Sequence, residues 1–325
     1  MIPRKMHKKL LEAAQKMPVV AIIGPRQSGK TTLAQQAFPS HKYVSLEDLK
    51  NREFAQEDPY SFFQTYENEF GIILDEIQNV PSLLSYIQVH ADKFKRPGYF
   101  VLTGSQNILV LEAITQTLAG RISIFTLLPL SITELKEANL LPDTIESCVF
   151  KGLYPRIYDQ NLTPVEWYPD YILTYLERDV RSIRSITDLS VFKRFLGLCA
   201  GRIGQLLNIT SLANDCGITL ATAKSWLSVL EASYIIYLFQ PFHINVGKRL
   251  VKSPKLYFYD PGLACSLLAI ESEEQLMMHY LRGGLVESFL LTDLFKLRYN
   301  QKLPPNFLRP FRYNQSSRPI NPGFG

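Results

Sequence analysis

The sequence indicates an α/β protein in which a parallel sheet comes first and helices follow. Short apolar runs at 71–75 and 99–105 end in polar residues, and a similar run at 18–24 ends in a glycine, as parallel strands often do. From about 130 to 200, aromatic and aliphatic residues recur at spacings of three and four, which is typical of amphipathic helices. We therefore expect a sheet domain followed by a helical region.

The composition is that of a folded globular protein. Of 325 residues, 46% are hydrophobic and 20% are charged, which excludes a disordered chain, and the length predicts two or three domains. The net charge of +5 permits a polyanionic partner without requiring one. The four cysteines form no CxxC pair, so we expect reduced, mostly buried thiols and no zinc site.

The N-terminus gives no sign of export. It is basic, but the stretch that follows is amphipathic and interrupted by Gln15 and Lys16, unlike the apolar core of a signal peptide. No run approaches the roughly 18 apolar residues that span a bilayer. We expect a cytoplasmic protein without membrane contact.

Residues 18–32, PVVAIIGPRQSGKTT, predict a strand, a glycine-containing loop and the start of a helix. The loop fits GxxxxGK[ST], in which backbone N–H groups surround a phosphate at the positive end of the helix. Lys30 is expected to reach the β- and γ-phosphates of ATP, and Thr31 to bind Mg²⁺. The predicted ATP contacts in this loop are Gly24, Pro25, Arg26, Gln27, Ser28, Gly29, Lys30, Thr31 and Thr32. The competing interpretation is a strand-to-helix turn without a ligand.

A second strand supplies the carboxylates that such a site needs. Asp75 and Glu76 end the apolar run GIIL, where Asp75 is placed to hold Mg²⁺ through water. Glu76 follows where a general base could polarise the attacking water, which favours a hydrolase over a small-molecule kinase. A solvated acidic pair at a strand end is the alternative.

The third strand ends in Thr103 and Ser105, which we predict to contact the γ-phosphate or the attacking water; an ordinary helix N-cap is the competing interpretation. Arg121, in the segment LAGRI, is a candidate catalytic cation for transition-state charge, within its own chain or across an interface. A surface salt bridge explains Arg121 equally well.

A family resemblance is carried by segments that occur in one order along the chain: GPRQSGKTT, IILDEIQNV, FVLTGSQN, LAGRI with LLPLSITEL, YLERDV and KLYFYDPGLA. Over roughly residues 1–300 the chain resembles the predicted AAA-type ATPases that carry a C-terminal domain of unknown function. The resemblance implies an ASCE-type P-loop ATPase core, a helical linker and a winged helix-turn-helix. It also implies that the nucleotide site comprises residues 24–32, Asp75 with Glu76, and the strand end at 103–105.

The resemblance suggests four segments: a P-loop AAA-type ATPase domain at 1–135, a helical linker at 136–200, a winged helix-turn-helix at 201–270 and a truncated start of a C-terminal domain at 271–325. Within the linker, Glu177, Arg178 and Asp179 match a family motif, although a solvated charged face explains them equally well.

The C-terminal segment departs from the family pattern. GGLVESF at 283–289 resembles the first helix of a nuclease-like domain, but the later strand motif is absent. Glu287 therefore lacks the partners of a metal-dependent nuclease, and we predict no cleavage activity. Residues 308–325, rich in Pro, Ser, Arg and Gly, are either an aberrant, frameshifted end or a disordered tail.

Residues 209–232 predict two helices joined by a turn at Gly217, with the second helix capped near Thr219. The second helix offers few groups that could read DNA bases. The candidate nucleic-acid contacts are Lys224 in this helix and Lys248, Arg249, Lys252 and Lys255 in the hairpin that follows. Either this region grips duplex DNA by its phosphates, or it is an internal packing module with a solvated basic run.

The leading functional hypothesis is a Mg²⁺-dependent ATPase that uses its nucleotide state to change its interactions with duplex DNA, a protein partner or a second copy of itself. The alternative is a nucleotide-gated scaffold or regulator with little turnover. An impaired, truncated copy would also fit the C-terminal sequence, whereas a small-molecule kinase would need an arginine-rich lid that we do not find.

Overall fold

The structure is a computed structural model that describes residues 2–105, 114, 116–175, 188–240 and 253–303. Several sequence predictions fall outside these ranges: the motif at 177–179, the basic residues Lys248, Arg249 and Lys252, and the tail at 308–325.

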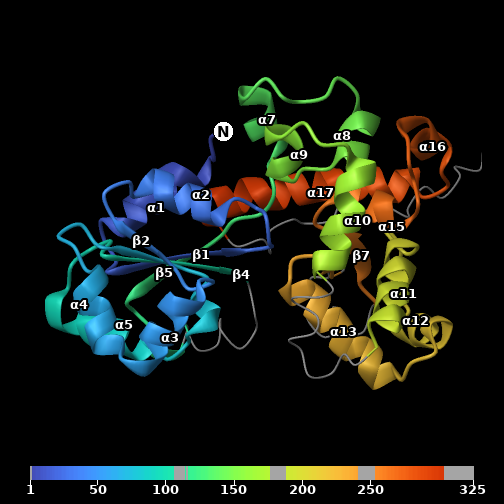
Figure 1. Cartoon of the computed structure of the whole chain (residues 1–325). Coiled ribbons are helices and arrows are strands. Elements are labelled where there is room, and N and C mark those ends of the chain that lie inside the picture. The colour runs from blue at the N-terminus through green and yellow to red at the C-terminus, as the bar shows by residue number, and fades with distance from the viewer. Residues whose placement is uncertain (1, 106–113, 115, 176–187, 241–252, 304–325) are drawn as a thin grey trace, which may run out of the picture.

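Strands and helices alternate in the N-terminal part, and helices dominate afterwards (Figure 1). The N-terminal elements are α1 (Met6–Ala14), β1 (Val19–Gly24), α2 (Lys30–Ala37), β2 (Lys42–Ser45), α3 (Leu49–Glu57), α4 (Pro59–Tyr66), β3 (Ile72–Asp75), η1 (Ile77–Asn79), α5 (Leu83–Phe94), β4 (Phe100–Ser105) and β5 (Ile122–Thr126). The later elements are α7 (Ile132–Glu137), α8 (Ile145–Lys151), α9 (Pro155–Asp159), α10 (Pro164–Tyr175), α11 (Leu189–Ala200), α12 (Ile209–Cys216), α13 (Leu220–Ala232), β6 (Ile236–Phe239), β7 (Lys255–Phe258), α15 (Pro261–Leu267), α16 (Glu273–Met278) and α17 (Arg282–Asn300).

The predicted α/β class is confirmed by a five-stranded parallel sheet of order β2-β3-β4-β1-β5. Strand β4 lies between β1 and β3, and Gly24 at the end of β1 is level with Ser105 at the end of β4. Because parallel strands end at one edge, this arrangement collects the loop after β1 and the polar ends of β3 and β4 there. Val19, at the opposite edge, pairs with Ile122.

Two apolar layers cover the sheet. One packs α3, α4 and α5 against one face, with Phe62 beside Phe63 and Phe63 edge-on to Phe100. The other places α1 and α2 on the opposite face, where Met6, Leu10 and Leu33 are buried (Figure 1). The strands read as continuous apolar runs because both faces of a parallel sheet are covered.

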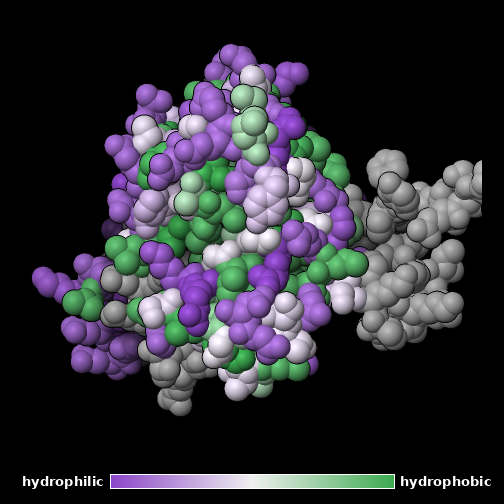
Figure 2. All heavy atoms as spheres, turned by 90° about the vertical axis from the view of Figure 1, so that its right-hand side faces the viewer, coloured by the Kyte–Doolittle hydropathy of each residue, from purple (hydrophilic) through white to green (hydrophobic). Residues whose placement is uncertain are grey.

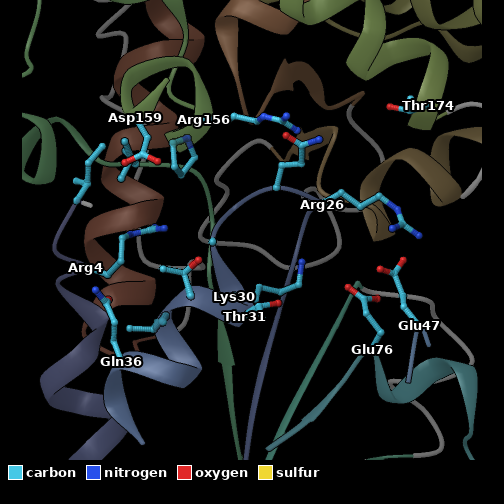
Figure 3. Close-up of a pocket in the computed structure, with 17 residues that line it drawn as sticks. Arg4, Arg26, Lys30, Thr31, Gln36, Glu47, Glu76, Arg156, Asp159 and Thr174 are labelled. Carbon is cyan, nitrogen blue, oxygen red and sulfur yellow. The ribbon is translucent and has the colours of Figure 1, made fainter. Parts of the chain in front are cut away.

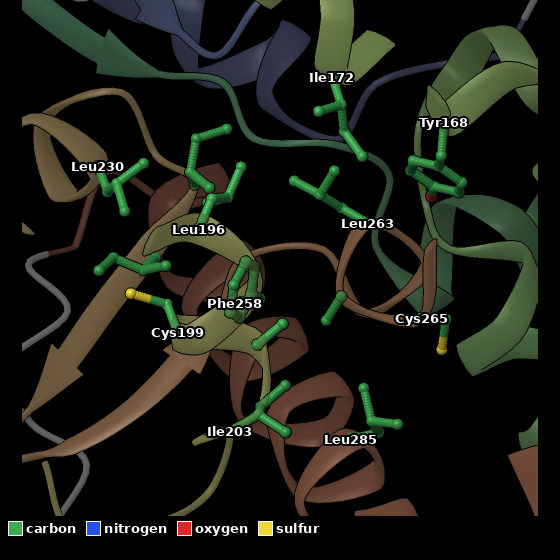
Figure 4. Close-up of a cluster of buried hydrophobic side chains, with 14 of the residues drawn as sticks. Tyr168, Ile172, Leu196, Cys199, Ile203, Leu230, Phe258, Leu263, Cys265 and Leu285 are labelled. Carbon is green, nitrogen blue, oxygen red and sulfur yellow. The ribbon is translucent and has the colours of Figure 1, made fainter. Parts of the chain in front are cut away.

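Most of the helical half shares one large core. A cluster of buried side chains extends from Leu130 to Phe289 and draws on α7–α13, β6, β7 and α15–α17; Figure 4 shows part of it. A smaller aromatic cluster around Tyr237, Tyr259 and Phe295 lies apart from it. The segments proposed at 136–200, 201–270 and 271–325 therefore share this core. All four cysteines are buried and free, as predicted, and burial raises the pKa of the Cys199 and Cys265 thiols.

The predicted helix–turn–helix is present as α12 and α13. Gly217 ends α12 in the left-handed region at φ 72°, and the Thr219 side chain caps α13 by accepting from the Thr222 N–H at 3.1 Å. The antiparallel pair β6–β7 follows, with Ile236 opposite Phe258. The turn and the cap lie where the sequence places them because glycine tolerates positive φ and threonine is a good N-cap.

The outer face of the helical half mixes hydrophobic and hydrophilic side chains (Figure 2). Met278 and Tyr280 are 89% and 82% exposed, respectively. Scattered apolar residues are normal on protein surfaces, so these two side chains alone indicate no interface.

Buried charged side chains connect distant segments of the helical half by hydrogen bonds and charge interactions. Asp260 accepts hydrogen bonds from Leu153 N at 2.7 Å, Tyr168 OH at 2.6 Å and Leu263 N at 2.9 Å. Lys296 in α17 is fully buried, and its Nζ has no hydrogen-bond partner among the described residues. Burial lowers the pKa of Lys296 to about 8, against the opposing charges of Asp260, Asp293 and Glu134.

This lysine should make stability depend on alkaline pH. Between about 8 and 10.5 the unfolded chain holds the lysine proton and the folded chain releases it, so the free energy of unfolding should rise with pH. We expect the unfolding free energy of wild type to rise with pH relative to that of Lys296→Met across this window, because methionine does not titrate. Urea denaturation at several pH values would measure it, and a flat difference would contradict the prediction.

Candidate functional site

The loop after β1 is shaped by three backbone positions in the positive-φ region. Gly24, Gln27 and Gly29 have φ of 151°, 59° and 91°. A Cβ on Gly24 would lie 2.2 Å from the carbonyl oxygen of Leu127, so only glycine fits there. Helix α2 then begins at Lys30, which directs the helix N-terminus at the loop.

Lys30, Thr31 and Asp75 meet at this edge of the sheet. Lys30 Nζ donates to the carbonyl oxygen of Pro25 at 2.8 Å, and Thr31 Oγ1 donates to Asp75 Oδ1 at 2.8 Å. Asp75 also accepts from Thr103 Oγ1 and, at 2.9 Å, from Tyr43 OH. The hydroxyl and carboxylate oxygens that the sequence predicts as metal ligands are thus in contact.

Tyr43 was not predicted from the sequence. Burial, followed by the charge of Asp75, raises its pKa to about 12, so its hydroxyl stays a donor to Asp75 at neutral pH. The pairing of Ser45 with Asp75 across β2 and β3 brings the tyrosine close to the carboxylate. No sequence motif marks this register.

Glu76 follows β3 in the left-handed conformation, with φ 59° and ψ 50°. Its carboxylate accepts from Gln78 Nε2, which also donates to Ser105 Oγ at 3.0 Å, while Ser105 Oγ lies 3.5 Å from Glu76 Oε2. Thr103 Oγ1 accepts from the Glu76 N–H at 3.3 Å. A non-glycine residue in this conformation costs about 1 kcal/mol or more and is common at functional sites. Thr103 therefore contacts both acidic residues and Ser105 contacts Glu76, while their predicted contact with the γ-phosphate or the attacking water stays a prediction. Gln78 was not predicted from the sequence.

A pocket of about 610 Å³ opens over these residues. The loop and α2 line one side, and the helical half lines the other through Arg156 and Asp159 of α9 and Thr174 of α10 (Figure 3). The lining side chains include Arg4, Arg26, Gln27, Lys30, Thr31, Thr32, Gln36, Glu47 and Glu76. Sequence reasoning missed Arg4, Arg156 and Asp159, because they reach the pocket only through the tertiary fold.

Arg121 is not brought to this pocket within its own chain. Its backbone carbonyl accepts from the Val19 N–H at 3.2 Å, so it lies at the sheet edge opposite to the loop. Its guanidinium pairs with Asp92, donating to Oδ2 at 2.9 Å, and this contact lowers the pKa of Asp92. The surface salt bridge is therefore the arrangement observed, and a role across an interface stays a prediction.

The structure describes two of the five candidate nucleic-acid contacts. Lys224 is exposed on α13. Lys255 Nζ lies 3.2 and 3.3 Å from the two carboxylate oxygens of Glu287 in α17. The basic run at 248–255 contains no acidic residue in the sequence, but the fold supplies Glu287 as the partner of Lys255 from a distant helix.

The comparisons with known proteins agree with this arrangement. Residues 16–136 match the family described as an AAA domain, and residues 142–274 match a domain of unknown function. Together with the parallel sheet, the first match supports an AAA-type P-loop ATPase. The second assigns neither a winged helix nor a nuclease.

Among curated proteins, this chain is similar to an uncharacterized protein of Mycobacterium bovis and to one of Mycobacterium tuberculosis, each 28% identical to it over 314 residues. These alignments cover 95% of this chain and 68% of each relative. Among solved structures, a Walker-type ATPase of Pyrococcus abyssi is similar in fold, with a TM-score of 0.54 at 16% identity over 82% of this chain and 96% of that one. Within the described part of the chain, no helix combines the length and apolar character needed to cross a bilayer.

Proposed function

We propose that this chain binds ATP with Mg²⁺ and hydrolyses the bond between the β- and γ-phosphates. The observation that carries the proposal is that Lys30 and Thr31 on one side and Glu76 on the other line one pocket, with Asp75 bonded to Thr31. A phosphate-binding loop facing a metal ligand and an adjacent second carboxylate suits phosphoryl transfer to water.

The donor set fits Mg²⁺. Magnesium is usually bound through one or two carboxylates together with waters and substrate phosphates, and needs no cage of protein ligands. Thr31 Oγ1 and Asp75 Oδ1, 2.8 Å apart, offer oxygen ligands of this kind. When bound, Mg²⁺ would neutralise phosphate charge and help to orient the nucleotide.

The remaining roles follow from position. Lys30 holds the β- and γ-phosphates, the loop N–H groups surround them, and Glu76 accepts a proton from the attacking water. Gln78 and Ser105 hold the Glu76 carboxylate. The Thr103 hydroxyl accepts from the Glu76 backbone N–H and donates to the Asp75 carboxylate, so it links the backbone of Glu76 to Asp75. Arg26 and Arg156 line the pocket and can supply cationic charge from the same chain, which Arg121 does not.

Phosphate release from magnesium-ATP tests the proposal. Lys30→Ala should lower kcat/KM by about 10²-fold or more, since it removes a cation from the transferring phosphoryl group. Lys42→Ala is the matched control, because Lys42 is exposed at the start of β2, away from the loop. Equal turnover by wild type and Lys30→Ala would refute the hydrolase.

A nucleotide-gated scaffold is the second candidate. The contacts of Glu76 with Gln78 and Ser105 favour it, because a carboxylate engaged by its neighbours is less available to a water. A partner, either duplex DNA or a protein, is proposed only from the basic residues Lys224, Lys248, Arg249, Lys252 and Lys255 of the sequence. Adding duplex DNA to the phosphate-release assay would test DNA as the partner. Faster phosphate release with DNA supports a DNA partner, and an unchanged rate opposes it.

A further inference from the structure

Arg4 is a buried arginine whose guanidinium spans three parts of the chain. It donates to the carbonyl oxygen of Ser28 at 2.6 Å and to that of Leu128 at 2.6 Å, and its Nε lies 3.1 Å from Glu134 Oε1. Its side chain is only 6% exposed, yet it contributes to the wall of the nucleotide pocket. Burying a guanidinium costs free energy unless its N–H donors make hydrogen bonds and its charge is paired.

Glu134 fixes the guanidinium from the other side. Burial would raise the pKa of the Glu134 carboxyl, but the charge of Arg4 and backbone hydrogen bonds from Ser131 and Lys5 lower it. Those bonds are 2.8 Å long in both cases, so the carboxylate has little freedom to turn. Helix α7 is tied in turn to α17, where Asp293 Oδ1 accepts from the Ile132 N–H at 2.7 Å.

The hydrogen bond from Arg4 to the Ser28 carbonyl fixes the orientation of the whole peptide unit between Ser28 and Gly29. The carbonyl of Ser28 and the N–H of Gly29 belong to one planar trans peptide unit, in which the two groups point in opposite directions. Holding the carbonyl toward Arg4 therefore holds the Gly29 N–H away from it. The Ser28 hydroxyl is buried without a hydrogen-bond partner among the described residues, so it does not share in this anchoring.

We propose that Arg4 is a positioning residue of the nucleotide site, which aims the Gly29 N–H at the bound phosphates by holding the Ser28 carbonyl. This inference rests on the proposed function, since it assigns a residue to the same pocket. It also ties the loop to the helical half through Glu134, so that the phosphate site is anchored in both halves of the chain.

The test compares Arg4→Met, which keeps most of the stem, with Arg4→Lys and with the control Lys5→Ala. Lys5 is the neighbouring residue, and its side chain pairs with Glu137 at the surface. Arg4→Met should weaken ATP binding by about 10-fold, the effect of misdirecting a hydrogen bond to a charged group. Arg4→Lys should recover part of the loss, and Lys5→Ala should match wild type.

Thermal melting with and without magnesium-ATP separates positioning from simple stability. A purely structural residue would lower Tm while leaving the ATP-induced rise in Tm intact, and that outcome would overturn the proposal. We expect the ATP-induced rise itself to shrink in Arg4→Met. If Arg4→Met does not fold, Glu134→Gln replaces it, because it removes the paired charge and should reduce the ATP-induced rise more mildly; an unchanged rise would again overturn the proposal.

The Lys30→Ala variant distinguishes the two possible failures. ATP binding and turnover that depend on Lys30 but not on Arg4 would refute the positioning role and leave the ATPase standing. Wild type that neither binds nor hydrolyses ATP in a Lys30-dependent way would refute the proposed function, and the inference would fall with it.

Discussion

Glu76→Gln is expected to reduce ATP turnover by about 10²- to 10⁴-fold while ATP binding is retained. Glutamine keeps the shape and the hydrogen-bonding oxygen of the side chain, but it cannot accept a proton from the attacking water. Binding should survive because the loop and Lys30 hold the phosphates from the other side of the pocket. Single-turnover phosphate release and ATP titration would measure the two effects separately.

Glu47→Gln is the matched control for this experiment. Glu47 lines the same pocket, so the variant makes the same chemical change and the same change in charge. Selective loss of turnover in Glu76→Gln identifies the base. If Glu76→Gln turns over ATP as fast as wild type, the role of Glu76 is refuted. If wild type is as slow as Glu76→Gln and still binds ATP, the nucleotide-gated scaffold is favoured.

Asp260→Ala is expected to destabilise the helical half by about 3–5 kcal/mol, the range for removing one partner of a buried charged network. Three buried donors, from Leu153, Tyr168 and Leu263, would lose their acceptor, and Lys296 would lose a compensating charge. Asp260→Asn should cost less, since its amide oxygen still accepts hydrogen bonds.

Urea unfolding would measure the Asp260 effect, with Asp215→Ala as the comparison. Asp215 pairs with Arg202, but its side chain is 49% exposed, so its loss should cost about 1 kcal/mol or less. Similar losses for the two alanine variants would show that the buried network contributes less than its hydrogen bonds suggest.

The sheet domain and the phosphate-binding part of the site could be predicted from local sequence. The loop at 24–31 and the acids at 75 and 76 each carry their chemistry within a few residues, and parallel strands end at one edge. The same edge holds Thr103 and Ser105, which lie beside the acids, while their contact with the γ-phosphate or the attacking water stays a prediction. The helix–turn–helix was equally legible, because Gly217 and Thr219 mark a turn and a cap.

The rest depends on contacts between distant parts of the chain. Arg4, Arg156 and Asp159 carry no motif and reach the pocket only when the two halves pack together. For Arg121 the sequence left a role within the chain, a role across an interface and a surface salt bridge open, because a short motif does not reveal at which edge of the sheet the residue will lie. Lys255 meets Glu287, a pairing separated by 32 residues and two intervening helices.

The bond between Arg4 and Glu134 joins residues 130 positions apart, and this has a consequence for synthesis. During translation Arg4 leaves the ribosome long before its partner, and strands β1 to β5 are complete at residue 126. A nascent chain halted at that point has its sheet strands but not Leu128 or Glu134, two of the three groups that hold Arg4. The nucleotide site should therefore be among the last parts of the N-terminal half to mature, and ATP should bind a chain halted at residue 126 less tightly than one that has reached Glu134.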